Sequence, residues 1–193
     1  NLSSKQRSST PKNNYLIFCK ITGFKNTNKR KIEQLQNILN QQGKLTNLEN
    51  SQLSFIEQNL INYTWNTKKE LIILKINFPI TTLRELINYS LIFEKNDVNN
   101  QMILDPLSGI MYLSLEFKQN KINKNLLYQL LNEFRKHIVS IGGFSVIQSC
   151  DISIKRKFDV WEKSQNNFFL METIKRKFDP NGILNKGRFI DKL

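Results

Sequence analysis

Residues 158–189 read FDVWEKSQNNFFLMETIKRKFDPNGILNKGRF, a lead-in that bears a tryptophan, followed by a predicted helix, a sharp stop and a turn. The apolar side chains of the helical part recur at steps of one, three and four, which places them on one face: Leu170, Met171, Ile174 and Phe178. Basic residues crowd the final turn, where the carbonyl end of the helix dipole favours positive charge. We therefore expect an amphipathic helix that packs through its apolar face.

The end of this helix is marked by two dipeptides. Pro180 disfavours a helical conformation at Asp179, so the helix is expected to end there. Asn181 and Gly182 adopt the positive backbone angles of a tight turn at little steric cost. The residues from Ile183 onward are therefore expected to run away from the helix axis.

The run FDPNGILNKGRF at residues 178–189 resembles the C-terminal signature of FAD-linked oxidases of the vanillyl-alcohol-oxidase type. That signature reads Phe-Asp-Pro-x-Gly-x-Leu-Asn-Pro-Gly followed by Lys or Arg. Within the family, three stretches resemble the E subunit of bacterial glycolate oxidases: GGFSV at 142–146, FDVW at 158–161 and METIK at 171–175. The resemblance is strong from about residue 141 onward and only a matter of pattern before it.

The resemblance implies an N-terminal FAD-binding half, a cap domain, and a C-terminus that runs back onto the flavin half. On this basis FAD is the cofactor, held mainly by a domain absent from this chain, and that N-terminal FAD-binding domain is the expected partner. Asn185, Gly187 and Arg188 are then expected near the flavin as cofactor-binding residues, while catalytic residues stay unassigned. The implied function is a C-terminal cap fragment of an FAD-dependent oxidoreductase for a 2-hydroxy acid such as glycolate, inactive when isolated.

Two departures from the family pattern leave a second interpretation open. Lys186 stands where the signature has proline, and the His-Gly-Asp-Gly stretch that binds metal in catalytic relatives is absent. His137 is the one histidine of the chain, and no metal site is expected. The alternative is a non-catalytic subunit that scaffolds an oxidase complex with other subunits. Any of Arg84, Arg135 and Arg188 could clamp a substrate carboxylate.

The rest of the chain predicts an α+β fold. Apolar runs predict strands at Tyr15–Ile21, Leu71–Phe78, Ile110–Phe117 and Phe144–Ser149. Helical periodicity predicts four helices: Lys29–Gln42, Gln52–Tyr63, Thr82 through Leu91, and Asn123 or Lys124 to Ile141. Gly43 is expected to end the first of them, and Gly142-Gly143 the last. This β-α-β-α-β-α-β order alone would allow a doubly wound parallel sheet, but no Gly-rich phosphate loop follows a strand.

The oxidase resemblance favours a mainly antiparallel sheet with helices packed on one face, as in ferredoxin-like cap domains. The expected domains are a polar arm or linker at 1–14, an α+β cap domain at 15–165, and a C-terminal helix and tail at 166–193 that returns toward the missing FAD-binding domain. Because the chain begins with Asn1, it is expected to be a piece of a longer product.

Composition supplies the third interpretation. The net charge of +13 and the pI near 9.8 suit an RNA-binding module. In such a module, the GGFSVIQS run at 142–149 would be the strand that recognises RNA. The chain is also rich in Asn, Lys and Ile, which an AT-rich genome favours through its codons. We favour this compositional drift as the origin of the charge, and we expect no nucleic-acid partner. No apolar run is long enough for a membrane span, so a cytoplasmic protein is expected. Cys19 and Cys150 are expected to be buried free thiols.

Overall fold

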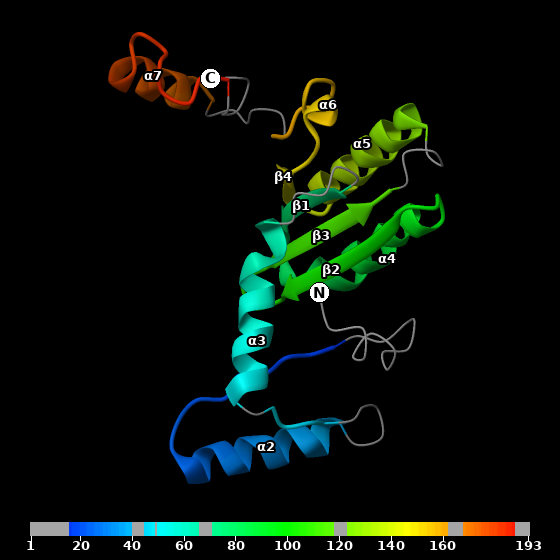
Figure 1. The fold of residues 1–193 in the computed structure, drawn as a ribbon, viewed down its shortest axis with the longest axis vertical. Helices are drawn as coiled ribbons and strands as arrows, with labels where there is room; N and C mark the ends of the chain where they lie inside the picture. Colours follow the sequence, from blue (N-terminus) through cyan, green and yellow to red (C-terminus); the bar gives the residue numbers. More distant parts are fainter. Residues whose placement is uncertain are drawn as a thin grey trace. The chain divides into compact units, whose positions relative to one another are not determined.

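The computed structural model describes residues 16–39, 45–48, 50–65, 71–117, 123–161 and 168–187. The chain divides into two compact units, Asn1–Leu60 and Ile61–Leu193. The first unit holds helix α2 (Lys25–Leu39) and nearly all of α3 (Asn50–Ile61), and the second holds the sheet and its helices (Figure 1). The domain bounds expected from the sequence stay a prediction.

The first unit corrects one expectation. The run Tyr15–Ile21 was expected to be a strand, but its described part, residues 16–21, has no regular structure, and the side chain of Ile17 is 80% exposed. An apolar run becomes a strand only where a neighbouring strand takes up its backbone hydrogen bonds, and no described residue does so here. α2 begins at Lys25, earlier than expected, while its expected stop at Gly43 lies outside the described residues.

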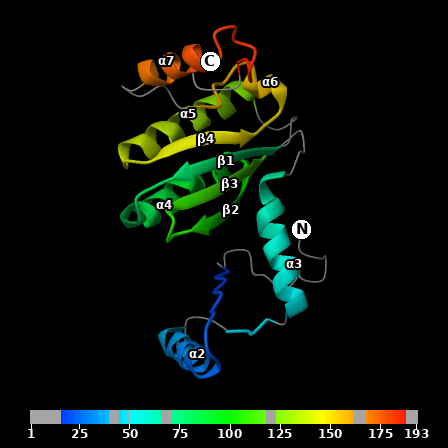
Figure 2. The same cartoon turned by 90° about the vertical axis from the view of Figure 1, so that its left-hand side faces the viewer.

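The second unit is built on one four-stranded sheet in the order β2-β3-β1-β4, in which every neighbouring pair is antiparallel (Figure 2). The strands are β1 (Leu71–Asn77), β2 (Asn99–Asp105), β3 (Ile110–Glu116) and β4 (Phe144–Ser149). α4 (Leu83–Glu94) follows β1 and α5 (Lys124–Ser140) follows β3. The resulting βαββαβ order is the ferredoxin-like one, and the expected α+β fold with a mainly antiparallel sheet is confirmed.

Strand β2 was not predicted from the sequence. Its first three residues, Asn99, Asn100 and Gln101, are polar, so the strand has little of the composition that marks a β segment. A tight turn that includes Gly109 joins β2 to β3, and Asp105 stabilises it by accepting a hydrogen bond from the Ser108 amide at 3.3 Å. The sheet therefore gains a hairpin where the predicted order had a single strand.

The core lies between the sheet and the two helices, which cover the same face (Figure 1). Alternate residues of each strand point to this face, as the pleat requires. The central strands contribute Ile72, Leu74, Ile76, Met111, Leu113 and Leu115, and α5 contributes Leu127, Leu130, Leu131, Phe134 and Ile138. Each such side chain contributes about 1.5–3 kcal/mol when fully buried. The expected buried stripe of α5 is confirmed at these five positions.

Local signals set the ends of several elements. The side chain of Asn123 caps α5 by accepting from the Asn125 amide at 2.9 Å, and Gly142 and Gly143 follow its last turn as predicted. Short helices complete the unit: η1 (Asn62–Trp65), η2 (Ile80–Thr82) and α6 (Ile152–Lys155). The last described helix is α7 (Phe168–Phe178). Among the described helices, none has the length and apolar character needed to cross a bilayer.

Candidate functional site

The C-terminal segment has the local structure that its sequence predicts. α7 ends just before Asp179, and Pro180 begins the turn that follows. Gly182 has a φ of 60°, and its amide donates to the Asp179 carbonyl at 3.0 Å. The stop and the Asn-Gly turn are therefore confirmed.

The Asp179 carboxylate organises this turn in a way that the sequence did not reveal. Its two oxygens accept hydrogen bonds from the amides of Ile183 and Leu184, each at 2.9 Å. The Lys175 ammonium, one helical turn earlier, donates both to this carboxylate and to the Leu184 carbonyl. We call this arrangement the Asp179 clasp; it comprises Lys175, Asp179, Ile183 and Leu184, and it fixes the tail against the end of α7.

The electrostatics of the clasp favour the ionised carboxylate. The hydrogen bond from Lys175 lowers the pKa of Asp179 most, the amides of Leu184 and Ile183 lower it further, and desolvation opposes them. The Asp179 residue is only 6% exposed, so its charge is shielded from water and is met by these three donors. A protonated Asp179 would lose the contact with the ammonium.

Two of the three expected cofactor-binding residues lie in the described tail. Asn185 and Gly187 are both exposed, with φ angles of 50° and 69°. Arg188 lies outside the described residues. No heavy atom of a described residue beyond its chain neighbours lies within 4 Å of the position that a Cβ would take at Gly187, so another molecule can approach its backbone closely. Binding of a cofactor by these residues stays a prediction.

Most apolar side chains of α7, and both of those in the described tail, are exposed. We call them the C-terminal ridge: Phe169, Leu170, Met171, Ile174, Phe178, Ile183 and Leu184. α7 has no buried residue, although its periodicity is that of a packing helix, and Glu172 and Arg176 pair on its polar side at 2.6 Å. Leu170, Met171, Ile174 and Phe178 share one helical face, and exposed apolar side chains grouped in this way are typical of interaction surfaces.

A second candidate lies on the sheet face opposite the helices. Strand pairing places Lys75 of β1 between Tyr112 of β3 and Val146 of β4. Tyr63 of η1 covers one end of this face, and its hydroxyl donates to the Gln101 carbonyl at 3.1 Å. Burial raises the pKa of Tyr63, against the smaller lowering effect of hydrogen bonds with Ser114. The end of the face around Lys75 stays open.

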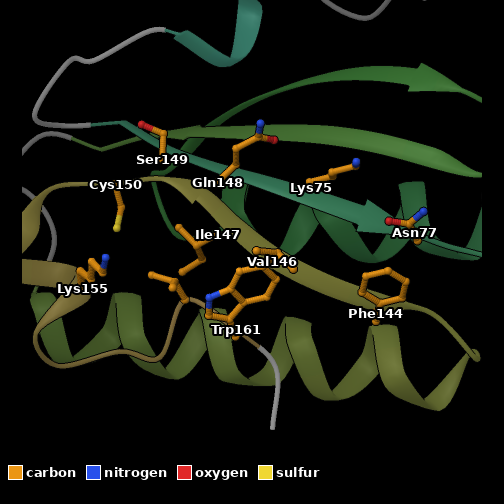
Figure 3. A pocket seen from close by; sticks show the side chains of 11 residues that line it. Lys75, Asn77, Phe144, Val146, Ile147, Gln148, Ser149, Cys150, Lys155 and Trp161 are labelled. Atoms are coloured by element: carbon orange, nitrogen blue, oxygen red, sulfur yellow. The ribbon is translucent and has the colours of Figure 1, made fainter. Parts of the chain in front are cut away.

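The open end forms a groove of about 720 Å³ beside β4 (Figure 3). Lys75 and Asn77 line it from β1, and Phe144 and Gln148 line it from β4. Trp161 lines it from the segment after α6, and the pairing of the Ile147 amide with the Val160 carbonyl at 2.8 Å holds that segment along β4. The groove was not predicted from the sequence, in which its one signal is a lysine inside the apolar run LIILKINF.

The arginines proposed as carboxylate clamps have different surroundings. Arg135 donates to the carbonyls of Asp159 and Trp161 at 3.0 and 3.3 Å, and its guanidinium lies 4.6 Å from the ring centre of Phe158. It therefore holds the segment that walls the groove. Arg84 is exposed on α4, whereas Arg188 lies outside the described residues.

The remaining reactive side chains show no site of their own. His137 stacks on Tyr89 with ring centres 3.8 Å apart and lies 3.5 Å from Glu85, at the boundary between α4 and α5. Cys19 is exposed, which corrects the expectation of burial, because the run around it is not part of a sheet. Cys150 is partly buried, and desolvation raises its pKa. No group of metal-ligating side chains converges within the described residues.

The C-terminal part of the chain matches a known family model. Residues 152–189 match the family model described as FAD linked oxidases, C-terminal domain, a family whose members are oxidoreductases. The matched stretch includes α6, α7 and the Asp179 clasp. It does not distinguish the E subunit of glycolate oxidase from other members. No curated protein matches the chain.

Proposed function

We propose that this chain is the C-terminal cap part of an FAD-dependent oxidoreductase that acts on a 2-hydroxy acid such as glycolate, as a glycolate oxidase subunit does. The family match over residues 152–189 supports the flavoprotein part of this proposal. The ferredoxin-like sheet supports the cap, because the sequence resemblance implies a cap domain of this fold. The choice of glycolate rests on the sequence resemblance alone.

The observation that carries the proposal is the exposed C-terminal ridge held in place by the Asp179 clasp. Phe178, Ile183 and Leu184 are 77, 76 and 57% exposed, and burying each would stabilise a complex by about 1.5–3 kcal/mol. The clasp fixes the tail backbone beforehand, so little conformational entropy is lost when a partner binds. The partner that the family match supports is an FAD-binding domain.

The chain fits a contributor to a flavin site better than a complete site. The described strands are followed by no Gly-rich phosphate loop of the dinucleotide-binding kind. The tail instead offers two exposed left-handed positions, Asn185 and Gly187. We infer that the Asn185 amide and the Arg188 guanidinium contact the flavin domain or its cofactor, and that the open backbone at Gly187 permits the close approach. When bound, FAD supplies the redox step.

A non-catalytic scaffold subunit is the second candidate. The chain has a single histidine, and His137 stacks on Tyr89 at the boundary between α4 and α5. The chain therefore cannot supply a histidine-rich catalytic site by itself. An RNA-binding module has less support, because only Tyr112 and Phe144 are aromatic on the open face of the described strands, where base stacking needs several.

The test is to co-express the chain with the FAD-binding domain of its parent gene and to measure visible flavin absorption in the purified complex. We expect a yellow complex, and Ile183→Asp should abolish copurification because it places a charge in the buried interface. Leu107→Asp is the matched control, since Leu107 is 92% exposed in the β2–β3 turn and is expected to have no effect.

A colourless wild-type complex, or equal copurification of both variants, would overturn the proposal. Anaerobic addition of glycolate or a larger 2-hydroxy acid then separates the two candidates. Bleaching of the flavin supports the oxidase. A flavin complex that no 2-hydroxy acid reduces until another subunit is added supports the scaffold.

A further inference from the structure

The described charged side chains that line the groove beside β4 are all positive. Among the described residues, the groove is lined by two lysines, Lys75 and Lys155, and by the amides of Asn77 and Gln148, but by no carboxylate. No ion pair among the described residues engages the Lys75 ammonium. A cation on a partly apolar sheet face gains most from an anion that also brings hydrogen-bond acceptors. The groove therefore suits an anionic ligand.

A β-bulge brings additional polar groups to the same place. The β1–β4 register shifts between Ile73 and Leu74, so Gln148 is an extra residue between the partners of these two positions. As a result, both Gln148 and Ser149 line the groove, instead of alternating between the two faces of the sheet. Figure 3 shows Gln148 of β4 and Lys75 of β1 projecting from neighbouring strands. Their side chains can serve one ligand group.

The walls and the size of the groove add a second requirement. Phe144, Val146 and Trp161 supply apolar and aromatic surface (Figure 3), and the Phe144 residue is 45% exposed. The volume of about 720 Å³ lies within the range of about 300–1,000 Å³ that holds drug-sized ligands. A two-carbon hydroxy acid would leave most of this surface wet. The ligand that matches the groove carries a bulky apolar body next to its anionic end.

We propose that the groove binds a 2-hydroxy carboxylate with a ring or a branched chain, with its carboxylate on Lys75 and its apolar body against Trp161 and Phe144. Gln148 assists by donating from its amide. This assignment rests on the proposed function, because it makes the bound acid the substrate of the oxidase. It replaces glycolate by a larger acid. Lys75 would be the cationic clamp, and Arg135 would be the residue that positions the wall bearing Trp161.

The test titrates the chain by itself with mandelate, mandelamide and glycolate, and follows the amide signals of β1 and β4 by NMR. We expect mandelate to bind at least tenfold more tightly than either of the other two ligands, since one lacks the charge and the other the ring. Lys75→Met should weaken mandelate binding about tenfold, the ratio that one charge-assisted hydrogen bond supplies. Trp161→Ala should weaken mandelate binding and leave glycolate binding unchanged. Lys95→Met is the matched control, because the exposed Lys95 follows α4 and does not line the groove.

Equal binding of mandelate and mandelamide to the wild-type chain would overturn the proposal. This comparison needs no variant, so it decides the question even if Lys75→Met fails to fold. Equal binding of mandelate and glycolate would overturn the requirement for a bulky body. The titration contains no flavin, and its outcome is therefore separate from the copurification test. A yellow complex whose isolated cap binds no acid would refute this assignment and leave the flavoprotein proposal standing.

Discussion

α5 and α7 have the same kind of sequence and opposite surroundings. Both show apolar residues at helical spacing, but α5 buries five of them against the sheet, while α7 has no buried residue. Phe134 is fully buried, and Phe178 is 77% exposed. Periodicity thus predicts a helix and its apolar face, but it does not say whether that face meets the same chain. The exposed face of α7 is the surface that the proposed FAD-binding domain would cover.

The largest expected effect separates these two phenylalanines. Phe134→Ala should destabilise the chain by about 3–5 kcal/mol, since it leaves a cavity among Phe93, Tyr89 and the sheet. Phe178→Ala should change the free energy of unfolding by less than about 0.5 kcal/mol, because its ring is already in water. Denaturant unfolding followed by circular dichroism measures both values. Similar losses in the two variants would show that the C-terminal ridge is part of the chain's own core.

Two glycines extend the comparison between the core and the tail to the backbone. Gly109 has a φ of 61°, and a Cβ there would lie 2.5 Å from the Phe78 carbonyl oxygen. Gly182 has nearly the same φ but open space around it. Gly109→Ala should therefore cost about 1–2 kcal/mol for the left-handed conformation and about 1–3 kcal/mol more for the overlap.

Gly182→Ala should carry only the conformational cost, and that cost should fall on the tail and not on global unfolding. The pair is measured by thermal unfolding together with the NMR signals of residues 181–187. If Gly182→Ala lowered the unfolding midpoint as much as Gly109→Ala does, the tail would have to be folded into the core.

The sequence predicted best where a single element decides the outcome. The stripe of α5, the stop before Pro180 and the Asn-Gly turn depend on residues close in sequence, and each is confirmed. β2 was missed because its polar first half depends on β3 for its pairing. The opposite error at residues 16–21 has the same cause, since composition gave a strand signal without a partner.

The candidate sites, too, could be predicted only where they depend on residues close in sequence. The groove joins Lys75, Gln148 and Trp161, which are distant in sequence and meet only through the β1–β4 pairing and the segment along β4. No periodicity reveals such a meeting. The Asp179 clasp is local, yet the Asp-Pro pair indicated only the end of a helix and not which amides the carboxylate would accept. The oxidase resemblance indicated the right segment without explaining its structure.

The smallest expected effect concerns the clasp, which holds the described tail through hydrogen bonds to Asp179. Asn at position 179 can accept through one oxygen only and cannot pair with the Lys175 charge. Asp179→Asn should therefore release the Ile183 or the Leu184 amide, raising its hydrogen exchange toward the rate of an open chain. The unfolding midpoint of the sheet should stay unchanged, in contrast to the core variants. Glu172→Gln is the matched control, since Glu172 pairs with Arg176 away from the turn.

The pH dependence of the same feature follows from the sign of the shift. Because the pKa of Asp179 is lowered in the folded tail, ionisation stabilises the clasp above the ordinary aspartate value of about 3.9, and this contribution is lost as the pH falls through the lowered value. The amide shifts of Ile183 and Leu184 should stay constant from neutral pH down to about pH 4 and should change together below it. A midpoint above the ordinary value would mean that desolvation outweighs the donors. In that case the tail would not be preorganised for its partner, and the contrast with the core would rest on exposure alone.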